Sequence, residues 1–317
     1  MAGPFIGHLA QLSAGVESTA GTPVSRTVGM RIVSVDFAPK LKKSALKNLT
    51  GDGTVAVATG TLAEAIDVSG NVKAQACYQG GMLGLLLELA MGSGSNTTTG
   101  SGPYTHTMVL APNQNTATVA IERGNSGSDD LLNGVKVSKF VLSVQTGQAM
   151  EVSADFVGMS YASRTGVAKS TPATPYYIKH NHVGTIGFDS ATYVASSFTL
   201  TIDRKTAPLM ELGSLTSAEP MPTDMLEVMV EAEIVVRDNA LQSAALAETS
   251  GDLTCTITDG TRSLAVTLHN AQIMEQSDPI SSVGVIKQKV KWQGFGDGTN
   301  HGLSVVLTNG DSSVRGS

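Results

Sequence analysis

The chain has few charged residues, few aromatic residues, few cysteines and no long apolar run. Charged residues make up 15 % of its 317 residues and aromatic residues 4 %, whereas glycine occurs 34 times. This composition excludes a charge-rich disordered chain and the Ala/Glu/Lys/Leu bias of a coiled coil. The longest apolar stretch, residues 82–91, contains Gly84 and Glu88 and is far shorter than the roughly 20 residues that span a bilayer. The sequence therefore predicts a folded, glycine-punctuated protein without a transmembrane helix.

The scarcity of cysteine also limits the chemistry. Cys77 and Cys255 lie too far apart in the sequence to form a CxxC metal pair, and two cysteines make no disulfide framework. We predict that both are buried free thiols. Residues 1–16 lack a basic segment and a sustained apolar core, so a cleaved secretory signal is not expected. We expect the protein to stay inside the cell that makes it.

The excess negative charge belongs to the second half of the chain. Residues 1–165 hold 11 basic and 11 acidic residues, whereas residues 166–317 hold 10 and 16, which accounts for the net charge of −6. Proteins that grip nucleic acid show the opposite sign. Any DNA near this protein is expected to slide past it.

The first half reads as strands around one helix. A β-type run over residues 30–37 is expected to end at Pro39, and a polar loop with Lys40, Lys42, Lys43 and Lys47 follows. Further expected elements are a half-buried strand over 69–77, an amphipathic helix over 82–91 ended by Gly92, a flexible loop over 92–102, short strands over 104–110 and 116–122, a glycine-rich break over 124–134, and a hairpin of 135–144 with 149–157. The lysine cluster fits a solvated loop or an inter-subunit contact with acidic groups.

The second half repeats this order. Strands are expected over 198–202, 226–236, 253–258, 263–269 and 283–293, with a helix over 240–248 and a proline-punctuated loop holding Pro208, Pro220 and Pro222. Strand, helix, hairpin and strand occur twice, which indicates a weak internal duplication at about 150 residues. We expect a mainly β protein with two tandem domains over residues 1–165 and 181–317, joined by a linker over 166–180.

No catalytic or cofactor motif is recognisable. The chain lacks Gx4GK[ST], HExxH, a GxSxG nucleophile elbow and a GxGxxG between strand and helix. His180 and His182 have a spacing that could hold a metal, but no cysteine or carboxylate lies close by in the sequence. We predict ordinary surface histidines, no catalytic residues, no metal and no cofactor.

Acidic side chains alternate along two of the expected strands. One face of 226–236 carries Glu227, Glu231 and Glu233, and one face of 149–157 carries Glu151 and Asp155. A solvated face is one explanation, and a water-filled surface that conducts a polyanion is the other. A basic face on the last long strand, with Lys287, Lys289 and Lys291, would neutralise much of this acid if that strand pairs with 226–236.

Three segments together resemble the tail tube (major tail) proteins of long-tailed bacteriophages. They are the strand leading to the glycine-bounded helix over 80–92, the run Tyr-Thr-His-Thr-Met over 104–108, and the hairpin over 134–158. The resemblance covers residues 30–160 best and 195–296 more loosely, as a second copy. It implies two tail-tube-like β-sandwich or half-barrel domains, each flanked by one short α-helix.

The resemblance also implies a function. Such proteins form rings that stack head to tail around a DNA-conducting lumen, and a chain with two such domains would form a pseudo-hexameric ring from three copies. It implies self-association, contact with other tail proteins such as the tape measure and the terminator, DNA that passes without specific binding, no membrane contact, assembly in the host cytoplasm and a place in the virion tail. Long loops bridge neighbouring rings in this family, which would suit residues 40–54 and 207–223. Glu151, Asp155, Glu227, Glu231 and Glu233 are the candidates for lining the lumen.

Two alternatives remain open from the sequence. A virion decoration or fibre-associated β-sandwich would share the composition without needing a duplication. A β-sandwich enzyme or carbohydrate-binding protein would need converging carboxylates or histidines, which the sequence does not indicate.

Overall fold

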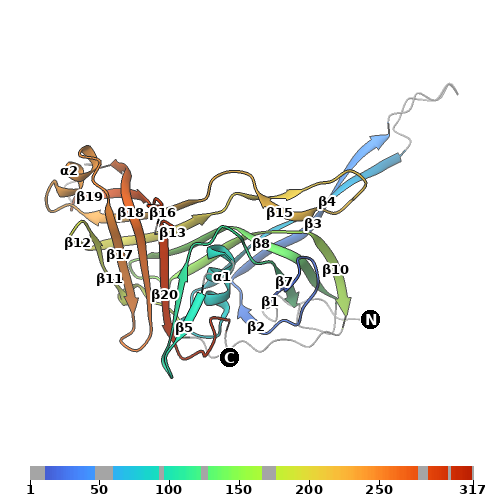
Figure 1. Ribbon diagram of the computed structural model, residues 1–317, viewed down its shortest axis with the longest axis horizontal. Helices are drawn as coiled ribbons and strands as arrows, with labels where there is room; N and C mark the ends of the chain where they lie inside the picture. The colour runs from blue at the N-terminus through green and yellow to red at the C-terminus, as the bar shows by residue number, and fades with distance from the viewer. Residues whose placement is uncertain are drawn as a thin grey trace.

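The computed structural model describes residues 11–46, 60–92, 96–122, 128–165, 176–277, 285–298 and 301–315, and strands make up most of them (Figure 1). In the first half the strands are β1 (Gln11–Val16), β2 (Val28–Arg31), β3 (Ser34–Leu46), β4 (Gly60–Gln75), β5 (Asn96–Thr99), β6 (Tyr104–Val109), β7 (Ala117–Glu122), β8 (Ser128–Gln145), β9 (Glu151–Gly158) and β10 (Ser160–Thr165). The second half holds β11 (Val183–Phe188), β12 (Ala191–Tyr193), β13 (Ala195–Asp203), β14 (Thr206–Leu209), β15 (Ala218–Pro222), β16 (Glu227–Val235), β17 (Gly251–Thr258), β18 (Ser263–Ser277), β19 (Lys287–Gln293) and β20 (Leu303–Asn309). The helices are α1 (Met82–Met91), α2 (Ala240–Leu246) and a short 3-10 turn, His180–His182.

One antiparallel sheet runs across both halves of the chain, and we call it the upper sheet. Its strand order is β3-β4-β9-β8-β13-β16-β19-β18. The halves meet where β13 pairs with β8, with Leu200 opposite Leu142 and Asp203 opposite Lys139. In Figure 1 this sheet lies along the top of the molecule, above α1.

Two further sheets pack beneath it. The first has the order β2-β1-β7-β8-β10, and the second has the order β12-β11-β17-β18-β20-β6-β5. Strands β8 and β18 are long enough to belong to the upper sheet at their C-terminal ends and to a lower sheet at their N-terminal ends. The apolar sides of the sheets enclose a core that includes Trp292, Phe140, Phe156, Phe188 and Phe198.

Helix α1 lies inside this core. The helix has the expected bounds, but all ten of its residues are buried, including Gly84 and Glu88, so the amphipathic character expected from the sequence is wrong. A helix that is largely apolar on all sides is stable only when protein surrounds it. The helix ends at Gly92, as expected, where φ is 112°, a conformation that glycine adopts without strain. Helix α2 differs, because only Leu241 is buried.

Several strand boundaries differ from the expectation. Pro39 does not end the strand, because β3 continues through it to Leu46 and takes in Lys40, Lys42 and Lys43. Proline is tolerated there because β3 is an edge strand paired on one side only, with β4, among the described residues. Residues 96–99 form β5 in place of the flexible loop, and β8 begins at residue 128, inside the expected glycine-rich break. Lys47, residues 93–95 and most of the proposed linker lie outside the described residues.

The loop expected around the three prolines is also an ordered hairpin. Pro208 lies in β14, and Pro220 and Pro222 lie in β15. The two strands form a small sheet of their own, in which the missing N–H groups of the prolines interrupt no central ladder.

Candidate functional site

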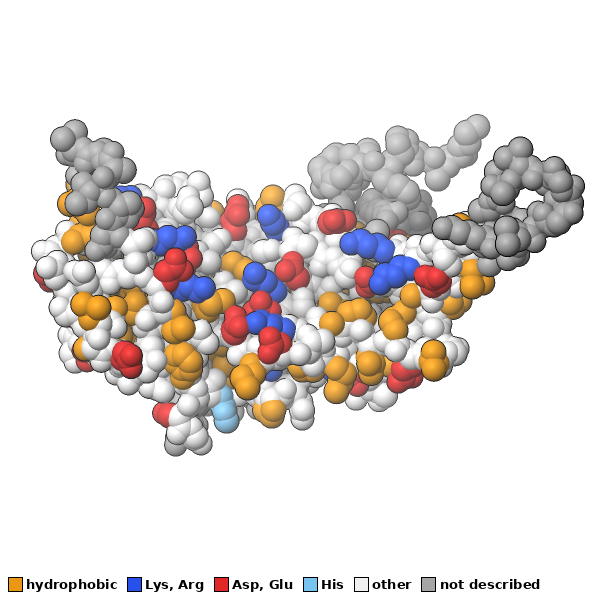
Figure 2. Space-filling view, turned by 90° about the horizontal axis from the view of Figure 1, so that it is seen from above, with side chains coloured by type: hydrophobic (Ala, Val, Ile, Leu, Met, Phe, Trp, Pro, Cys, Tyr) orange, Lys and Arg blue, Asp and Glu red, His pale blue; other side chains and the backbone are white. Residues whose placement is uncertain are grey.

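The outward face of the upper sheet carries the acidic residues that the sequence singled out. Successive side chains of a strand point to opposite faces, and the register places Glu151 and Asp155 of β9 on the same face as Glu227, Glu231 and Glu233 of β16. We call this surface the upper face. Figure 2 views the molecule from above Figure 1 and shows acidic and basic side chains interspersed along it. The five carboxylates therefore share one surface, although they come from both halves of the chain.

Lysines neutralise three of these five carboxylates. Strand β19 pairs with β16, the condition under which these lysines were expected to neutralise the acid, and the register places Lys289 and Lys291 opposite Glu233 and Glu231. The ion pairs run diagonally. They are Lys287 Nζ to Glu233 Oε2 at 2.9 Å, Lys289 Nζ to Glu231 Oε1 at 2.9 Å, and Lys205 Nζ to Glu227 Oε1 at 2.5 Å.

The pKa shifts follow from these contacts. The Ser196 hydroxyl and the Lys287 ammonium donate to the Glu233 carboxylate and lower its pKa. The hydrogen bond to Glu227 raises the pKa of Lys205, and the hydrogen bond to Glu231 raises the pKa of Lys289. The shifts favour the ionised form of Glu233 and the protonated forms of Lys205 and Lys289, so the upper face carries charges of both signs.

Asp155 is held differently. The amide of Asn71, opposite it on β4, donates hydrogen bonds to the Asp155 carboxylate and to the Ser153 hydroxyl, the latter at 3.0 Å. Lys139 lies opposite Asp155 on β8. Glu151 is exposed at the end of β9. The part of the upper face supplied by the first half thus combines charged side chains with neutral polar ones.

The β14–β15 hairpin lies across the end of the upper face in the first half. Lys136 Nζ donates to Pro220 O at 2.8 Å and forms an ion pair with Glu219 Oε1 at 2.7 Å. Ser217 Oγ donates to Gly158 O at 3.0 Å, and Ile66 N donates to Leu215 O at 2.7 Å. The hairpin therefore fastens the second half of the chain onto β4, β8 and β9.

The three described lysines of the expected basic loop are not covered by another segment of the described chain. Lys40, Lys42 and Lys43 are exposed on β3. The β3–β4 hairpin extends beyond the rest of the molecule at one end (Figure 1), and we call its described distal part, residues 40–46 and 60–66, the arm.

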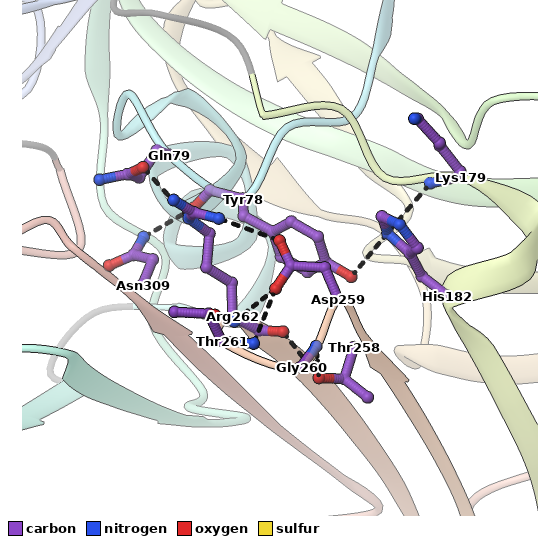
Figure 3. Close-up of polar contacts among 10 residues, drawn as sticks. All are labelled: Tyr78, Gln79, Lys179, His182, Thr258, Asp259, Gly260, Thr261, Arg262 and Asn309. Atoms are coloured by element: carbon purple, nitrogen blue, oxygen red, sulfur yellow. Dashed lines mark hydrogen bonds and ion pairs between the residues drawn. The ribbon is translucent and has the colours of Figure 1, made fainter.

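A second polar cluster joins the two halves beneath the upper sheet (Figure 3). Arg262 donates to Asp259 Oδ2 at 3.0 Å and to Gln79 Oε1 at 3.2 Å, and its guanidinium lies 3.6 Å from the centre of the Tyr176 ring. The Tyr78 hydroxyl lies 3.4 Å from His182 Nδ1, and burial, reinforced by Asp259, raises the pKa of this phenol above its usual range. The cluster thus consists of the protonated Tyr78 phenol, the Arg262–Asp259 ion pair and the stacking of Arg262 on Tyr176. These contacts hold the two halves together and have a structural role.

The histidines do not form a metal centre in the described part of the chain. His182 contacts Tyr78, whereas His180 is exposed, and no group of three or more potential ligands converges among the described residues. Within those same residues, no helix has the length and apolar character needed to cross a membrane.

Comparison with protein families identifies the class. The model of a family described as phage tail tube protein matches residues 7–294, which is nearly the whole chain. The chain therefore belongs to the phage tail tube protein family, and it is a structural protein of the virion tail. The mainly β fold agrees with the tail tube fold implied by the resemblance seen in the sequence. The comparison with curated proteins gives no match.

Proposed function

We propose that this protein is the major tail tube subunit, which forms stacked rings around a lumen through which phage DNA passes. The upper face lines the lumen, and three copies form each ring. The protein acts as a passive conduit without catalysis. It assembles in the host cytoplasm, where it associates with itself, with the tape measure inside the tube and with the terminator at its end.

The continuity of the upper sheet carries this proposal. Each half of the chain contributes four neighbouring strands, β3-β4-β9-β8 and β13-β16-β19-β18, and these join edge to edge. A sheet with two open edges either protects them or pairs them with another chain, and closure into a cylinder removes them altogether. Three chains would place six such four-stranded units around a pseudo-sixfold axis.

The chemistry of the upper face supports passage without binding. Each phosphate contact with a lysine or arginine adds affinity for DNA and thereby friction. On the upper face Lys205, Lys287 and Lys289 are engaged by Glu227, Glu233 and Glu231. Paired in this way, they are less available to phosphates, and the carboxylates keep the local potential from becoming positive. DNA would therefore meet a hydrated surface of nearly balanced charge.

Negative-stain electron microscopy of the purified full chain tests the proposal directly. Rings or tubes with an open centre are expected, and native mass spectrometry of solubilised rings should give three chains per ring. Only monomers at high protein concentration would contradict the tube assignment. Six chains per ring would be compatible with a tube. It would contradict the proposal that each chain contributes two of the six four-stranded units of a ring.

A further inference from the structure

The two long strands β8 and β18 have the same local construction. The residue at the bend between the sheets has a positive φ in both, 63° at Gly134 and 47° at Asn270. Just beside each bend the same backbone hydrogen bond forms, from Met159 N to Asn133 O at 3.0 Å and from Phe295 N to His269 O at 3.2 Å.

A register shift then follows in both strands. It lies between Val137 and Lys139 in β8 and between Ile273 and Glu275 in β18. Each of these features in β18 lies 136 positions after its counterpart in β8. Lys139 and Glu275 are therefore equivalent positions.

The equivalence extends across the upper sheet. In the first half Phe156 lies opposite Gly70, which lies opposite Phe37. In the second half Trp292 lies opposite Val230, which lies opposite Leu200. Phe37 thus corresponds to Leu200, and counting along the two strands makes Lys40 the counterpart of Asp203.

The pairing of β13 with β8 has no equivalent between β3 and β18 among the described residues. Strand β13 pairs with β8, whereas β3 pairs only with β4, and residues 272–277 of β18 pair only with β19, among the described residues. Among the described residues, β3 and the C-terminal part of β18 thus each have one strand partner in the upper sheet, and their outer edges correspond to the two edges that are joined within the chain.

We propose that one copy of this chain joins the next through β18 and β3, in the register that repeats β8 and β13. This rests on the proposed ring assembly and names the contact that closes it. The equivalence places Glu275 of one copy opposite Lys40 of the next, just as Lys139 lies opposite Asp203 within the chain. The signs are exchanged between the two joins, but each pairs one cation with one anion. Opposite charges at directly opposed positions stabilise an antiparallel pair, and like charges destabilise it.

The arm fits the same arrangement. In the chain, the arm lies between the parts of β3 and β4 that correspond to β13 and β16, just as the β14–β15 hairpin lies between β13 and β16. The β14–β15 hairpin crosses β8 and β9. The arm would accordingly cross β18 and β19 of the neighbouring copy. Near the corresponding end of that half lies a hollow lined by Pro222, Asp224, Leu226, Gly296 and His301, among others. Figure 1 shows the arm projecting beyond the rest of the molecule.

The join between copies should also be the weaker of the two. Arg204 N donates to Ser138 O at 2.8 Å. Alternate residues of an antiparallel strand direct their N–H groups to the same neighbouring strand, so the N–H of Ile202, two residues earlier, also points toward β8. The counterpart of Ile202 is Pro39, which has no N–H. One ladder bond is therefore missing from the β3–β18 join.

Disulfide trapping in the full chain tests the register. In a background of Cys77→Ala and Cys255→Ala, the variant with Lys40→Cys and Glu275→Cys is oxidised after assembly. The residues directly opposite in such a ladder have Cα atoms about 4.5–5.5 Å apart, within disulfide range. We expect interchain disulfides that produce species of up to three chains.

Two matched variants serve as controls. Lys139→Cys with Asp203→Cys should form an intrachain disulfide at the equivalent join. Asp36→Cys with Glu275→Cys should cross-link poorly, because residue 36 lies about 13 Å along the strand from residue 40. Cross-linking of Lys40→Cys with Glu275→Cys no faster than this off-register control would overturn the proposed register.

Charge exchange gives an independent readout. Lys40→Glu and Glu275→Lys should each reduce assembly at least about threefold. The double variant should restore part of it, because position 40 also lies opposite Asp67 and position 275 opposite Lys291 within the chain, where each substitution creates a like-charge pair. Micrographs of the same samples separate the two proposals. Open tubes without the expected cross-link would overturn the register alone, whereas the absence of any ring or tube from the unmodified chain would overturn the ring assembly and this join together.

Discussion

The Arg315 guanidinium forms two hydrogen bonds with the Glu88 carboxylate, from Nε to Oε2 at 2.8 Å and from Nη2 to Oε1 at 2.6 Å. Glu88 is 1 % exposed and lies on α1, within the core. The hydrogen bond also raises the pKa of Arg315. The C-terminal segment thereby supplies a positively charged partner for a carboxylate inside the protein.

Arg315→Ala should destabilise the protein. Among the described residues, it leaves the Glu88 carboxylate with one remaining side-chain partner, the Asn115 amide at 3.3 Å. Breaking a buried ion pair by removing one partner costs about 3–5 kcal/mol, and we expect the lower end because Arg315 is partly exposed. Chemical denaturation measures the loss. Adding Glu88→Gln should recover most of it, and equal stability of the single variant and the unmodified chain would contradict the role of the pair.

Arg204→Met should loosen the C-terminal end of α1. The Arg204 guanidinium donates to Ala90 O at 2.7 Å, to Ala111 O at 2.8 Å and to Met91 O. Burial lowers its pKa to about 10, so the hydrogen bonds hold the charge against a desolvation cost. Methionine retains the apolar stem but leaves these carbonyls without this donor, which should cost about 2–4 kcal/mol. Thermal unfolding measures this. The unfolding midpoint of Arg204→Lys, which keeps the charge but has fewer donors, should lie between those of Arg204→Met and the unmodified chain. An unchanged midpoint for Arg204→Met would contradict this role of Arg204.

Charge on the upper face should control DNA passage in the assembled tail. Glu231→Lys adds a cation beside Lys289 and leaves both without a carboxylate partner at this pair, so phosphate contacts and friction should increase and ejection should slow. The combined variant with Glu231→Lys and Lys289→Glu exchanges the signs and keeps the net charge, so it should eject DNA normally. Ejection rates from tails built with each variant provide the measurement. Equal, normal rates for both variants would contradict the assignment of this face to the lumen.

Both thiols should react slowly in the folded protein. Burial raises the pKa of Cys77 to about 11 and that of Cys255 to about 12. The thiolate is the reactive form, and its fraction at pH 8 should be at least about a hundredfold below that of a free cysteine with a pKa near 8.5. Labelling with a thiol reagent should therefore accelerate as the pH rises, and Cys77 should react before the fully buried Cys255. Rapid labelling of the native protein at pH 8 would contradict both shifts, and urea-unfolded protein gives the reference rate.

Local patterns in the sequence predicted several elements well. The expected helix agrees with α1, and the expected hairpin around residues 145–148 agrees with β8 and β9, because a short-range period and a turn determine each of them. The sequence left open whether the lysine-bearing strand pairs with β16, and the register shows that it does. Strand β20 was missed, although Leu303, Val305 and Leu307 alternate with half-buried positions and provided a usable signal.

Other features depend on contacts that no local pattern encodes. Pro39 suggested the end of a strand, but its effect depends on whether its missing N–H faces a partner, and that is a property of the sheet. The common face of Glu151 and Glu231 likewise depends on the pairing of β8 with β13, whose residues lie more than 50 positions apart along the chain. The identities of the acidic residues were visible in the sequence, but their lysine partners required the register.

The β8–β13 ladder lies within one chain, so its two strands cannot separate by diffusion. Tethering converts such a contact into an intramolecular one, with an effective concentration set by the connecting chain and independent of how much protein is present. Dilution therefore leaves this ladder intact, whereas any contact between separate copies depends on protein concentration. The smallest unit that can be added to or lost from a larger assembly is thus a pair of four-stranded units already in fixed register.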